Sequence, residues 1–415
     1  AAAEATRPLK IAMSTTSDPL TELLGVDSSE FLAADWERHP RHIGSAATSF
    51  RAALSLDDMD EVVVRAESDD AAASQTVVLL FKALEQAHGY ASAHAAFADG
   101  ASIVINHVDK AWPPLNDLCA RLGERFRYAF ANLYFTPHAS QTAPPHSDDR
   151  DVFVLQMHGA KRWRVWPCDH CDAQLLPFAD EQAGKEPRPK LRADELGAPE
   201  LECTLQPGDA LYIPRGAIHV AETAAAEGEC SLHVTVAIPT ADLCWSGFVA
   251  QAATRGCMDS LPFRRALPLG PLSSEGEGLR EAFAARWEEM LAVELGDARR
   301  VLAQKMDRHR AQQADARRRA EARPRTGADG GLRAGSRLRK AVAVEVIDAR
   351  DGRLVVQAPD AYAFAPPELH AAAREFGAWA VGREFALGEL PARHAFLRAC
   401  VARILLRLEA VEVLE

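Results

Sequence analysis

The stretch PPHSDDRDVFVLQMHGAKRWRVW, residues 144–166, decides the fold that we predict for this chain. Its apolar run DVFVLQM is typical of a β-strand, yet His146 and Asp148 precede the run and Lys161 follows it. Such side chains are costly to bury unless they are paired or bind a charged group. The stretch therefore indicates strands that surround something charged.

Short apolar runs of the same kind continue on both sides, from residue 128 to residue 240. Pro, Gly and Asp turns separate them, and this pattern predicts an antiparallel sandwich or small barrel. The runs are YAFANLYF, DVFVLQM, KRWRVWP, LECTLQPGDALYIP and CSLHVTVAI.

Helices are expected in front of these strands. FLAADWERHP (31–40) predicts an amphipathic helix that ends near Pro40, and TVVLLFKALEQAHG (76–89) predicts another that stops at Gly89. INHVDKAWPPLNDLCARLGERF (105–126) predicts a strand end, a Pro-Pro break and a third helix.

Beyond Pro239 the pattern becomes helical, with predicted helices over 279–295 and 297–322 and a linker at 326–331. The last segment begins with the alternating run VAVEVIDARDGRLVV, in which Asp351-Gly352 marks a hairpin turn, and continues with helices near 368–381 and 393–408 and a strand VEVL. This order of elements predicts a winged-helix-like module.

The fold class is therefore predicted as α+β. We expect a catalytic domain with its N-terminal helices over 14–243, a helical region over 244–326, and a winged-helix-like domain over 332–415.

Composition narrows the class of protein. The 415 residues are 48% apolar, and the formal net charge of −12 argues against a surface that binds nucleic acid by neutralising phosphates. Eight cysteines lack the spacing of a disulfide scaffold, and no apolar run approaches the length of a membrane span, so an intracellular protein is expected. Cys168 and Cys171 form one CxxC, interpreted as a loop, with metal or redox chemistry as the alternative.

Two arms of polar residues are expected to meet on the strands. Residues i and i+2 of a strand face the same way, so His146 and Asp148 can converge on one point. LQPGDALYIPRGAIHVAET supplies the second arm, with a turn at Arg215-Gly216 before His219. Two His and one carboxylate form the ligand set of non-haem Fe(II) oxygenases, which leave positions open for a co-substrate and O2.

Other histidines compete as metal ligands in this part of the chain. His138, His158 and His170 lie nearby in sequence, and His233 lies within SLHVTVA. Only His233 is expected to point inward, where it is better explained as a group beside the metal or the co-substrate.

These motifs resemble those of the JmjC-type ribosomal oxygenases, which are cupin-fold enzymes that use Fe(II), 2-oxoglutarate and O2 to hydroxylate ribosomal proteins. The likeness rests on residues 144–166, on LQPGDALYIPRGAIHVAET and on SLHVTVAI. DWERHPRHI, FANLYFTPHASQTAPPH and SLPFRRALPLG extend it over most of the chain. The resemblance implies a double-stranded β-helix, a helical dimerisation region and a C-terminal winged helix.

The resemblance also implies roles for single residues. His146, Asp148 and His219 match the iron ligands. Lys161 matches the lysine that pairs with the distal carboxylate of 2-oxoglutarate, and Thr235 is expected to contact the same co-substrate.

Asn132 and Tyr134 match the family's substrate-holding pair. The alternative for both is structural, with Tyr134 packing in the strand and Asn132 satisfying a neighbouring strand.

Two departures from the family pattern lie where the target residue would be recognised. Ala237 stands where the histidyl hydroxylases have a serine, and Ser147 stands where an aromatic residue is common. Iron and 2-oxoglutarate are therefore firmer predictions than the residue type that is hydroxylated.

The leading hypothesis is hydroxylation of a ribosomal-protein histidine. Demethylation of N-methyl-lysine on histones is the alternative within the same chemistry, and a non-catalytic cupin or winged-helix adaptor is the alternative outside it. An adaptor would predict damage to the triad or to Lys161, and all four residues are intact. Phe283, Trp287, Leu291 and Leu295 form an apolar stripe at helical spacing, and packing of this stripe on the cupin of a monomer is one interpretation. The resemblance implies instead that these helices pair two chains, so we expect a homodimer. We expect no direct binding to nucleic acid or membrane. The compartment would be the nucleus or nucleolus in a eukaryote and the cytoplasm in a bacterium.

Overall fold

The structure is a computed structural model of the chain. It describes residues 18–44, 50–68, 75–138, 140–167, 181–186, 188–223, 229–256, 261–264, 283–288, 290, 295–322, 331–349 and 354–414. Cys168, Cys171, His170, the Asp351–Gly352 turn and Leu291 lie outside these ranges.

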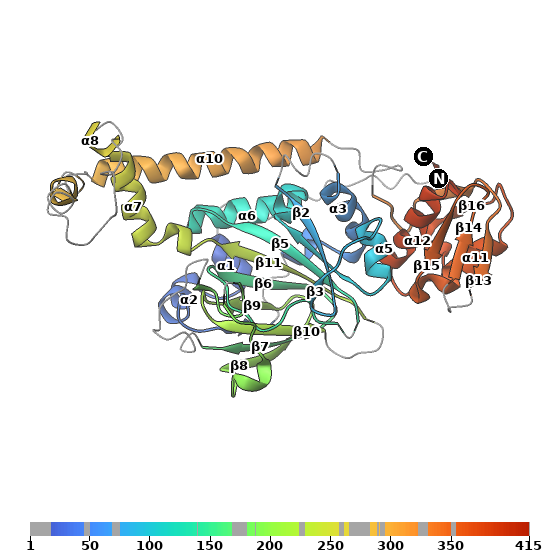
Figure 1. Cartoon of the computed structure of the whole chain (residues 1–415), viewed down its shortest axis with the longest axis horizontal. Helices are drawn as coiled ribbons and strands as arrows, with labels where there is room; N and C mark the ends of the chain where they lie inside the picture. The colour runs from blue at the N-terminus through green and yellow to red at the C-terminus, as the bar shows by residue number, and fades with distance from the viewer. Residues whose placement is uncertain are drawn as a thin grey trace, which may run out of the picture.

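Two antiparallel sheets face each other at the centre of the molecule (Figure 1). The larger sheet has the order β1-β9-β6-β11-β5-β4-β2-β3 and the smaller has the order β10-β7-β8. Between them lies a buried apolar cluster that includes Phe130, Trp163 and Leu211. The predicted double-stranded β-helix is confirmed. Its strands are β1 (Arg41–Ile43), β2 (Val77–Lys82), β3 (Glu85–Gln86), β4 (Ser102–Asn106), β5 (Phe130–Thr136), β6 (Asp151–His158), β7 (Lys161–Trp166), β8 (Leu201–Leu205), β9 (Ala210–Ile213), β10 (Ile218–Thr223) and β11 (Ser231–Ile238).

Strands β6 and β11 pair at the middle of the larger sheet, and almost every residue of both is buried. Their aliphatic side chains suit a strand that is covered on both faces. Gln156 is a buried polar residue within β6, and its amide donates to the carbonyl groups of His158 and Gly159 and to the Ser231 hydroxyl. At Gly159, where φ is +63°, a Cβ would lie 2.0 Å from the Cys230 carbonyl oxygen, so the β6–β7 turn requires glycine here.

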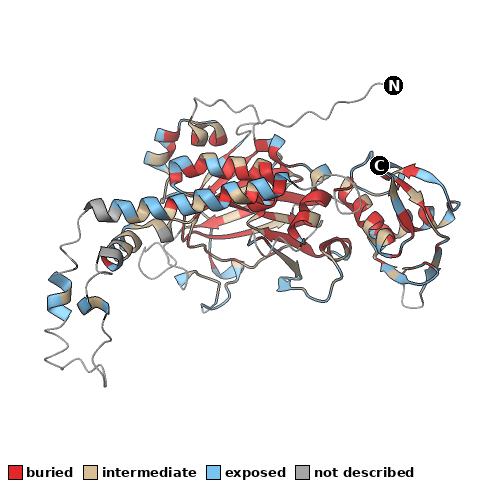
Figure 2. Cartoon of the chain, turned by 90° about the horizontal axis from the view of Figure 1, so that it is seen from above, coloured by how far each residue is buried: buried red, intermediate tan, exposed pale blue. Residues whose placement is uncertain are grey.

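Helices cover the outer face of the larger sheet, and Figure 2 shows their buried sides turned toward it. Helix α2 begins after Asp27, whose carboxylate accepts from the backbone N–H groups of Ser29 and Glu30. Helix α6 begins at Pro113, a residue preorganised for the first helical turn. The helices are α1 (Pro19–Leu24), α2 (Ser28–Ala34), α3 (Met59–Ala66), α5 (Ala93–Ala98) and α6 (Pro113–Phe126), with 3-10 turns η1 (Phe50–Ala53), η2 (Leu56–Asp58), η3 (Val108–Lys110), η6 (Ala193–Glu195) and η7 (Ala241–Leu243).

The helix predicted over residues 76–89 is wrong, because this segment forms strands β2 and β3 joined by Ala83 and Leu84. Val78 of β2 lies opposite Ile105 of β4 and packs against the main core. Pairing with a strand already in the sheet therefore outweighs the helical preference of LEQA.

The helix predicted over 31–40 is shorter than expected. It ends as α2 at Ala34, and the chain turns before reaching Pro40.

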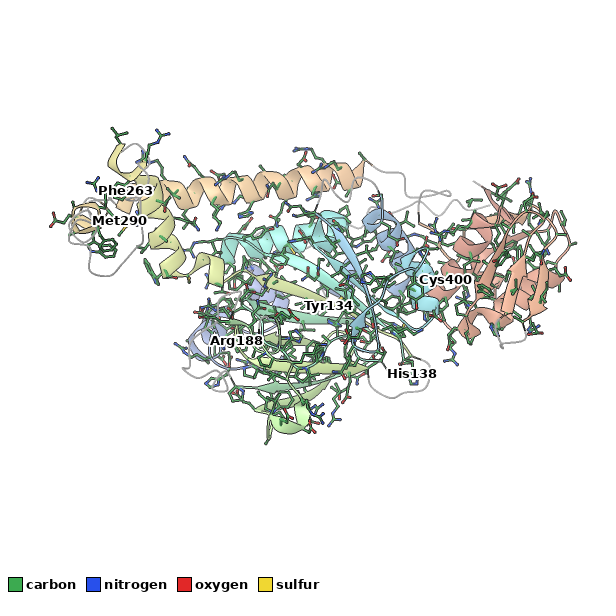
Figure 3. The ribbon with its side chains drawn as sticks, in the orientation of Figure 1. Tyr134, His138, Arg188, Phe263, Met290 and Cys400 are labelled. Atoms are coloured by element: carbon green, nitrogen blue, oxygen red, sulfur yellow. The ribbon has the colours of Figure 1, made fainter. Side chains whose placement is uncertain are left out.

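A helical arm leaves the barrel after β11. It contains α7 (Trp245–Gly256), α8 (Leu261–Arg264), a helical piece at 283–288, and α10 (Leu295–Glu321), which runs back across α6 (Figure 1). Gln313 of α10 donates to the Ala129 carbonyl at 2.8 Å, and its own carbonyl accepts from the Asn116 amide at 3.2 Å. Arg317 pairs with Asp117. Figure 3 shows Phe263 and Met290 at the outer end of the arm, far from Tyr134 in the barrel.

The C-terminal part packs two three-stranded antiparallel sheets around two helices. The expected hairpin strands at 342–356 are present as β13 and β14, but the part contains more strands than the sequence indicates. The sheets are β16 (Glu384–Ala386), β12 (Arg337–Lys340) and β17 (Val411–Leu414), and β13 (Glu345–Asp348), β14 (Leu354–Gln357) and β15 (Tyr362–Ala365). The helices are α11 (His370–Ala378) and α12 (Ala395–Arg407), with 3-10 turns η8 (Pro367–Leu369) and η9 (Leu387–Glu389).

Asp60 of α3 joins this C-terminal part to the helices beside the larger sheet. Its carboxylate, 2% exposed, accepts two hydrogen bonds from Arg403 of α12 at 2.9 and 2.6 Å. It also contacts His94 Nε2 at 2.8 Å and accepts from the Leu332 backbone N–H at 2.6 Å. One buried carboxylate thus links α3, α5, α12 and the segment that follows the predicted linker.

Within the described ranges, every helix is too short or too polar to traverse a lipid bilayer.

Candidate metal centre

The two predicted arms meet through a backbone bridge between His146 and His219. The His146 N–H donates to the His219 carbonyl at 3.1 Å, and the His219 N–H donates to the His146 carbonyl at 2.8 Å. His146 therefore lies on a single bridge, and Asp148 lies outside any regular strand, where the sequence predicted a strand. The i, i+2 alternation still brings both side chains to one side.

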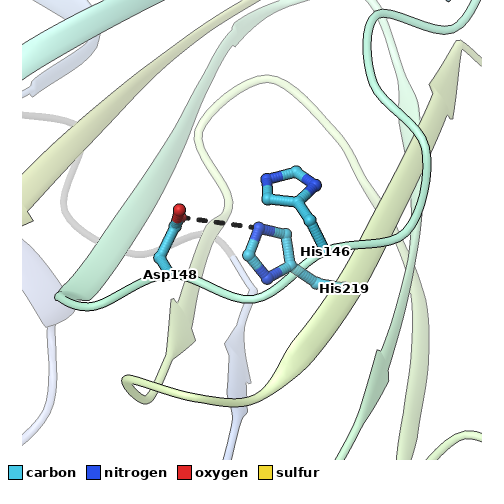
Figure 4. A group of neighbouring side chains, drawn as sticks. All are labelled: His146, Asp148 and His219. Carbon is cyan, nitrogen blue, oxygen red and sulfur yellow. Dashed lines mark ion pairs between the residues drawn. The ribbon is translucent and has the colours of Figure 1, made fainter. Parts of the chain in front are cut away.

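His146, Asp148 and His219 converge as predicted (Figure 4). One donor atom from each residue lies within 4.8 Å of the other two. His219 Nε2 is 3.7 Å from Asp148 Oδ2, and the two imidazole centroids are 4.5 Å apart. Among the described residues, this is the one group of three or more such side chains placed to hold a metal ion. His138, His158 and His233 are not part of it.

Both imidazoles are oriented by their own backbone. His146 Nδ1 is 2.9 Å from the Pro144 carbonyl oxygen, and His219 Nδ1 is 3.1 Å from the Ala217 carbonyl oxygen. A carbonyl oxygen accepts only, so each Nδ1 carries the proton and each Nε2 keeps its lone pair for a metal.

The charge state of the three groups suits a cation. Burial and the neighbouring His219 and Lys185 lower the pKa of His146 to about 3, and burial also lowers the pKa of His219. For Asp148, burial alone would raise the pKa, but Lys185 and the two imidazoles hold it well below its usual range. The centre therefore presents two neutral imidazoles and one carboxylate.

Lys161 lies at the start of β7 with 2% of its surface exposed. Its ammonium donates to the Thr136 hydroxyl at 3.1 Å, and burial lowers its pKa to about 7. The Lys161 ammonium forms no carboxylate pair within the described ranges. A buried cation with this environment suits an anionic ligand.

Aromatic rings line the space around His233. Trp163 meets His233 edge-on with centroids 5.5 Å apart. His233 Nδ1 and Trp163 Nε1 are buried polar atoms without a hydrogen-bond partner in the described part of the chain. Burial and the charge of Lys161 keep the pKa of His233 well below its ordinary value. Unsatisfied polar atoms beside a buried cation are consistent with a polar ligand in this space.

The other predicted site residues lie on β5 and β11. Asn132 is opposite Thr235 in the β5–β11 register, two positions from the Tyr134–His233 pair. Asn132 Oδ1 accepts a hydrogen bond from the backbone N–H of His107, a residue with φ of +54°. Asn132 therefore stabilises the backbone at His107, which is a structural role.

Ala237 and Ser147 are both buried. Ala237 belongs to the apolar cluster between the two sheets, whereas Ser147 bonds to residue 183.

Sequence reasoning missed Thr136 and Lys185. Thr136 shares a strand face with Asn132 and Tyr134, and this alternation was a usable signal. Lys185 pairs with Asp148 from a loop 37 residues later, and nothing in the local sequence marks that contact.

The side chains at this site suit the two ligands that the resemblance implies, iron and 2-oxoglutarate. Two neutral imidazoles and a carboxylate suit a divalent first-row metal with open positions. Lys161, Thr136 and the unpartnered ring nitrogens suit a dicarboxylate beside that metal.

The part of the chain that carries the triad is similar to a known domain family. A model of the JmjC domain matches residues 104–243. The chain is 30% identical over 251 residues to the bifunctional lysine-specific demethylase and histidyl-hydroxylase NO66 of Culex quinquefasciatus. These 251 residues are 58% of this chain and 37% of the relative. It is 38% identical over 154 residues to ribosomal oxygenase 1 of Homo sapiens, over 36% of this chain and 22% of the relative. The chain thus spans well under half the length of these relatives.

Among solved structures, the chain is similar to YcfD, a ribosomal oxygenase from Escherichia coli, with 16% identity and a TM-score of 0.47. The match covers 94% of this chain and 99% of that one.

Proposed function

We propose, from the JmjC domain that residues 104–243 form, that this chain is an Fe(II)- and 2-oxoglutarate-dependent dioxygenase that hydroxylates a protein side chain. The observation that carries the proposal is the convergence of His146, Asp148 and His219 near the buried cation Lys161. That combination holds a metal and a dicarboxylate side by side.

In the proposed reaction, 2-oxoglutarate and O2 are consumed, succinate and CO2 are released, and one oxygen atom of O2 enters a C–H bond of the substrate while the other enters succinate. Iron supplies the oxidative chemistry when bound. The two imidazoles and the carboxylate hold it, and Lys161 pairs with the distal carboxylate of 2-oxoglutarate. Tyr134 and Trp163 exclude water from the space around His233.

A ribosomal-protein histidine is the proposed target. The support is the name of the human relative, a ribosomal oxygenase, and the histidyl-hydroxylase activity in the name of the Culex relative. That second name also includes lysine-specific demethylation, so removal of a methyl group from histone N-methyl-lysine is the second candidate. Asn132, Tyr134 and Thr235 are proposed to hold substrate or co-substrate, with Ala237 and Ser147 near the position where the target is recognised.

The proposed organisation keeps residues 14–243 as the catalytic domain and residues 244–326 as a dimerisation region. Residues 332–415 are proposed as a winged-helix-like accessory that does not read DNA. The exposed side chains of Trp245, Phe283 and Trp287 on the helical arm support pairing of two chains. We propose a nuclear or nucleolar site of action in a eukaryote and a cytoplasmic one in a bacterium.

One experiment separates the candidates. The full chain is incubated with Fe(II), 2-oxoglutarate and ribosomal extract, and peptides that gain one oxygen atom are mapped by mass spectrometry. An Asp148→Ala chain is the control. A hydroxylated histidine that depends on Asp148 supports the proposal. Formaldehyde release from methylated histone peptides would favour demethylation, and absence of succinate formation would favour the adaptor.

A further inference from the structure

A short loop lies against the metal-ligand arm. In this segment, residues 181–186, the Ala183 carbonyl accepts from the Ser147 N–H at 2.9 Å, and the Ala183 N–H donates to the Ser147 hydroxyl at 2.8 Å. Ser147 lies between two of the three ligands, so these bonds fix the loop directly against the triad.

Gly184 allows this close approach. Its φ is +71°, and a Cβ at this position would lie 2.3 Å from the Pro145 carbonyl oxygen and 3.1 Å from His146 Cα. An L side chain would therefore push the loop away from His146.

The loop delivers Lys185 to one oxygen of Asp148. The Lys185 ammonium donates to Asp148 Oδ1 and to Gln182 Oε1, the latter at 3.0 Å. The other carboxylate oxygen, Oδ2, is the one that faces His219 Nε2 at 3.7 Å. The two oxygens of Asp148 thus have separate surroundings.

Stabilisation of the fold is a poor explanation for this pair. The Lys185 side chain is 38% exposed and that of Asp148 is 21% exposed, and ion pairs this accessible to water contribute about 0–1 kcal/mol. Orientation of a metal-binding carboxylate is a stronger explanation, because groups that hydrogen-bond to metal ligands fix their direction and basicity.

We infer that Lys185 is a positioning residue for the metal centre, which holds Oδ1 of Asp148 so that Oδ2 alone is offered to the metal. The inference rests on the proposed function, since it assumes that the triad binds a metal. It also gives a reason for Ser147, one of the two residues that depart from the family pattern, because its backbone and hydroxyl fix the loop that carries Lys185.

The test measures metal binding without turnover. Co(II) is titrated into the full chain and into Lys185→Met, with calorimetry for affinity and visible absorption for the coordination of the metal. We expect Lys185→Met to weaken Co(II) binding by roughly 10–100-fold, as is typical for partners of metal ligands, and to change the spectrum. Lys185→Arg should recover most of the affinity.

Two further variants sharpen the test. Lys190→Met is the matched control, because Lys190 follows in the same part of the chain but pairs with Glu85 in solvent, 72% exposed. It should bind Co(II) like wild type. Gly184→Ala should reproduce the loss with Lys185 intact, and thermal melting checks that each variant is folded.

The outcomes are distinct. If Lys185→Met binds Co(II) as tightly as wild type or more tightly, with the same spectrum, Lys185 does not position Asp148, and tighter binding would identify it as a competitor of the metal. If wild type binds no Co(II), the proposed metal centre itself is wrong, and this inference is overturned with it.

Discussion

The imidazole of His233 lies face to face with the phenol ring of Tyr134, with centroids 4.8 Å apart and planes 2° from parallel. Burial and the charge of Lys161 lower the pKa of His233, whereas burial and the charge of Asp148 raise the pKa of Tyr134 to about 12. The stack is therefore within the electrostatic reach of both the lysine proposed to bind 2-oxoglutarate and the carboxylate of the metal centre.

Loss of this stack should uncouple the reaction. Tyr134→Ala opens the space beside His233 to water, so we expect succinate formation to exceed substrate hydroxylation, which in wild type it should match. Tyr134→Phe keeps the ring and should remain coupled. Both products are measured in the same samples, and matched yields from the Ala variant would show that the ring does not protect the reaction.

Removal of a single triad ligand should abolish turnover. Ala at His146, Asp148 or His219 leaves two of the three protein donors, so succinate production should fall by more than about a hundredfold, beyond the loss typical of outer-sphere partners. Circular dichroism checks that the barrel is folded. Full activity of any one variant would remove that residue from the triad.

Lys161→Ala should raise the concentration of 2-oxoglutarate needed for half-maximal rate. A hydrogen bond to a charged group contributes about 1.5–3 kcal/mol, which corresponds to roughly 10–100-fold. Co(II) should still bind, because Lys161 is not a ligand. Arg162→Ala is the matched control, since Arg162 points to solvent and pairs with Glu202 at 2.5 Å. Equal effects of the two variants would place the co-substrate elsewhere.

Acid should weaken the link that Asp60 forms between α3 and the C-terminal part. Burial opposes ionisation of Asp60, but hydrogen bonds from His94 and Arg403 outweigh it and lower its pKa from 3.8 to about 2. A lowered pKa in the folded state means that the stabilisation is complete above pH 4 and disappears as the pH falls toward 2.

Urea unfolding measures this contribution. At pH 7, Asp60→Asn should lower the free energy of unfolding by about 3–5 kcal/mol, because Arg403 loses its buried partner. The difference in free energy of unfolding between wild type and Asp60→Asn should narrow by about 2 kcal/mol between pH 4 and pH 2. Asp57→Asn, at an exposed neighbour, should show neither effect. If this difference in free energy does not change with pH, ionised Asp60 does not stabilise the fold as we propose.

Light scattering should return twice the monomer mass of 45.1 kDa. Phe283 and Trp287 stack with centroids 5.9 Å apart while 63% and 49% exposed, so replacing both with Asp should give monomers. Val381→Asp, at an exposed apolar residue of the C-terminal part, is the control that should stay dimeric. A wild-type mass near 45.1 kDa would count against the dimer.

The triad could be predicted because each of its residues is marked by a pattern of only a few neighbouring residues. His146 and Asp148 are two residues apart, and the turn at Arg215-Gly216 comes shortly before His219. Strand alternation and turn residues were therefore sufficient to predict that the three side chains converge. The strands between residues 128 and 240 were predictable for the same reason, since turn residues bound the apolar runs there.

Features that depend on distant pairing were not predictable in this way. Residues 76–89 have a locally helical pattern, and only β4, whose partner positions begin at Ser102, turns them into a strand. Lys185 reaches Asp148 from a loop, and Asp60 meets Arg403 across 343 residues of sequence. Contacts of this kind follow from the assembled fold and leave no periodic signal.

Helix α10 sets the distance between the two metal centres of the proposed dimer. Its 27 residues correspond to about 40 Å, and its C-terminal half is fixed to the barrel through Gln313 and Arg317. If two chains join at the outer end of the arm, the distance between their metal centres is set by a rigid rod and not by a flexible tether. A partner that engaged both centres at once would have to present its two target residues at that spacing.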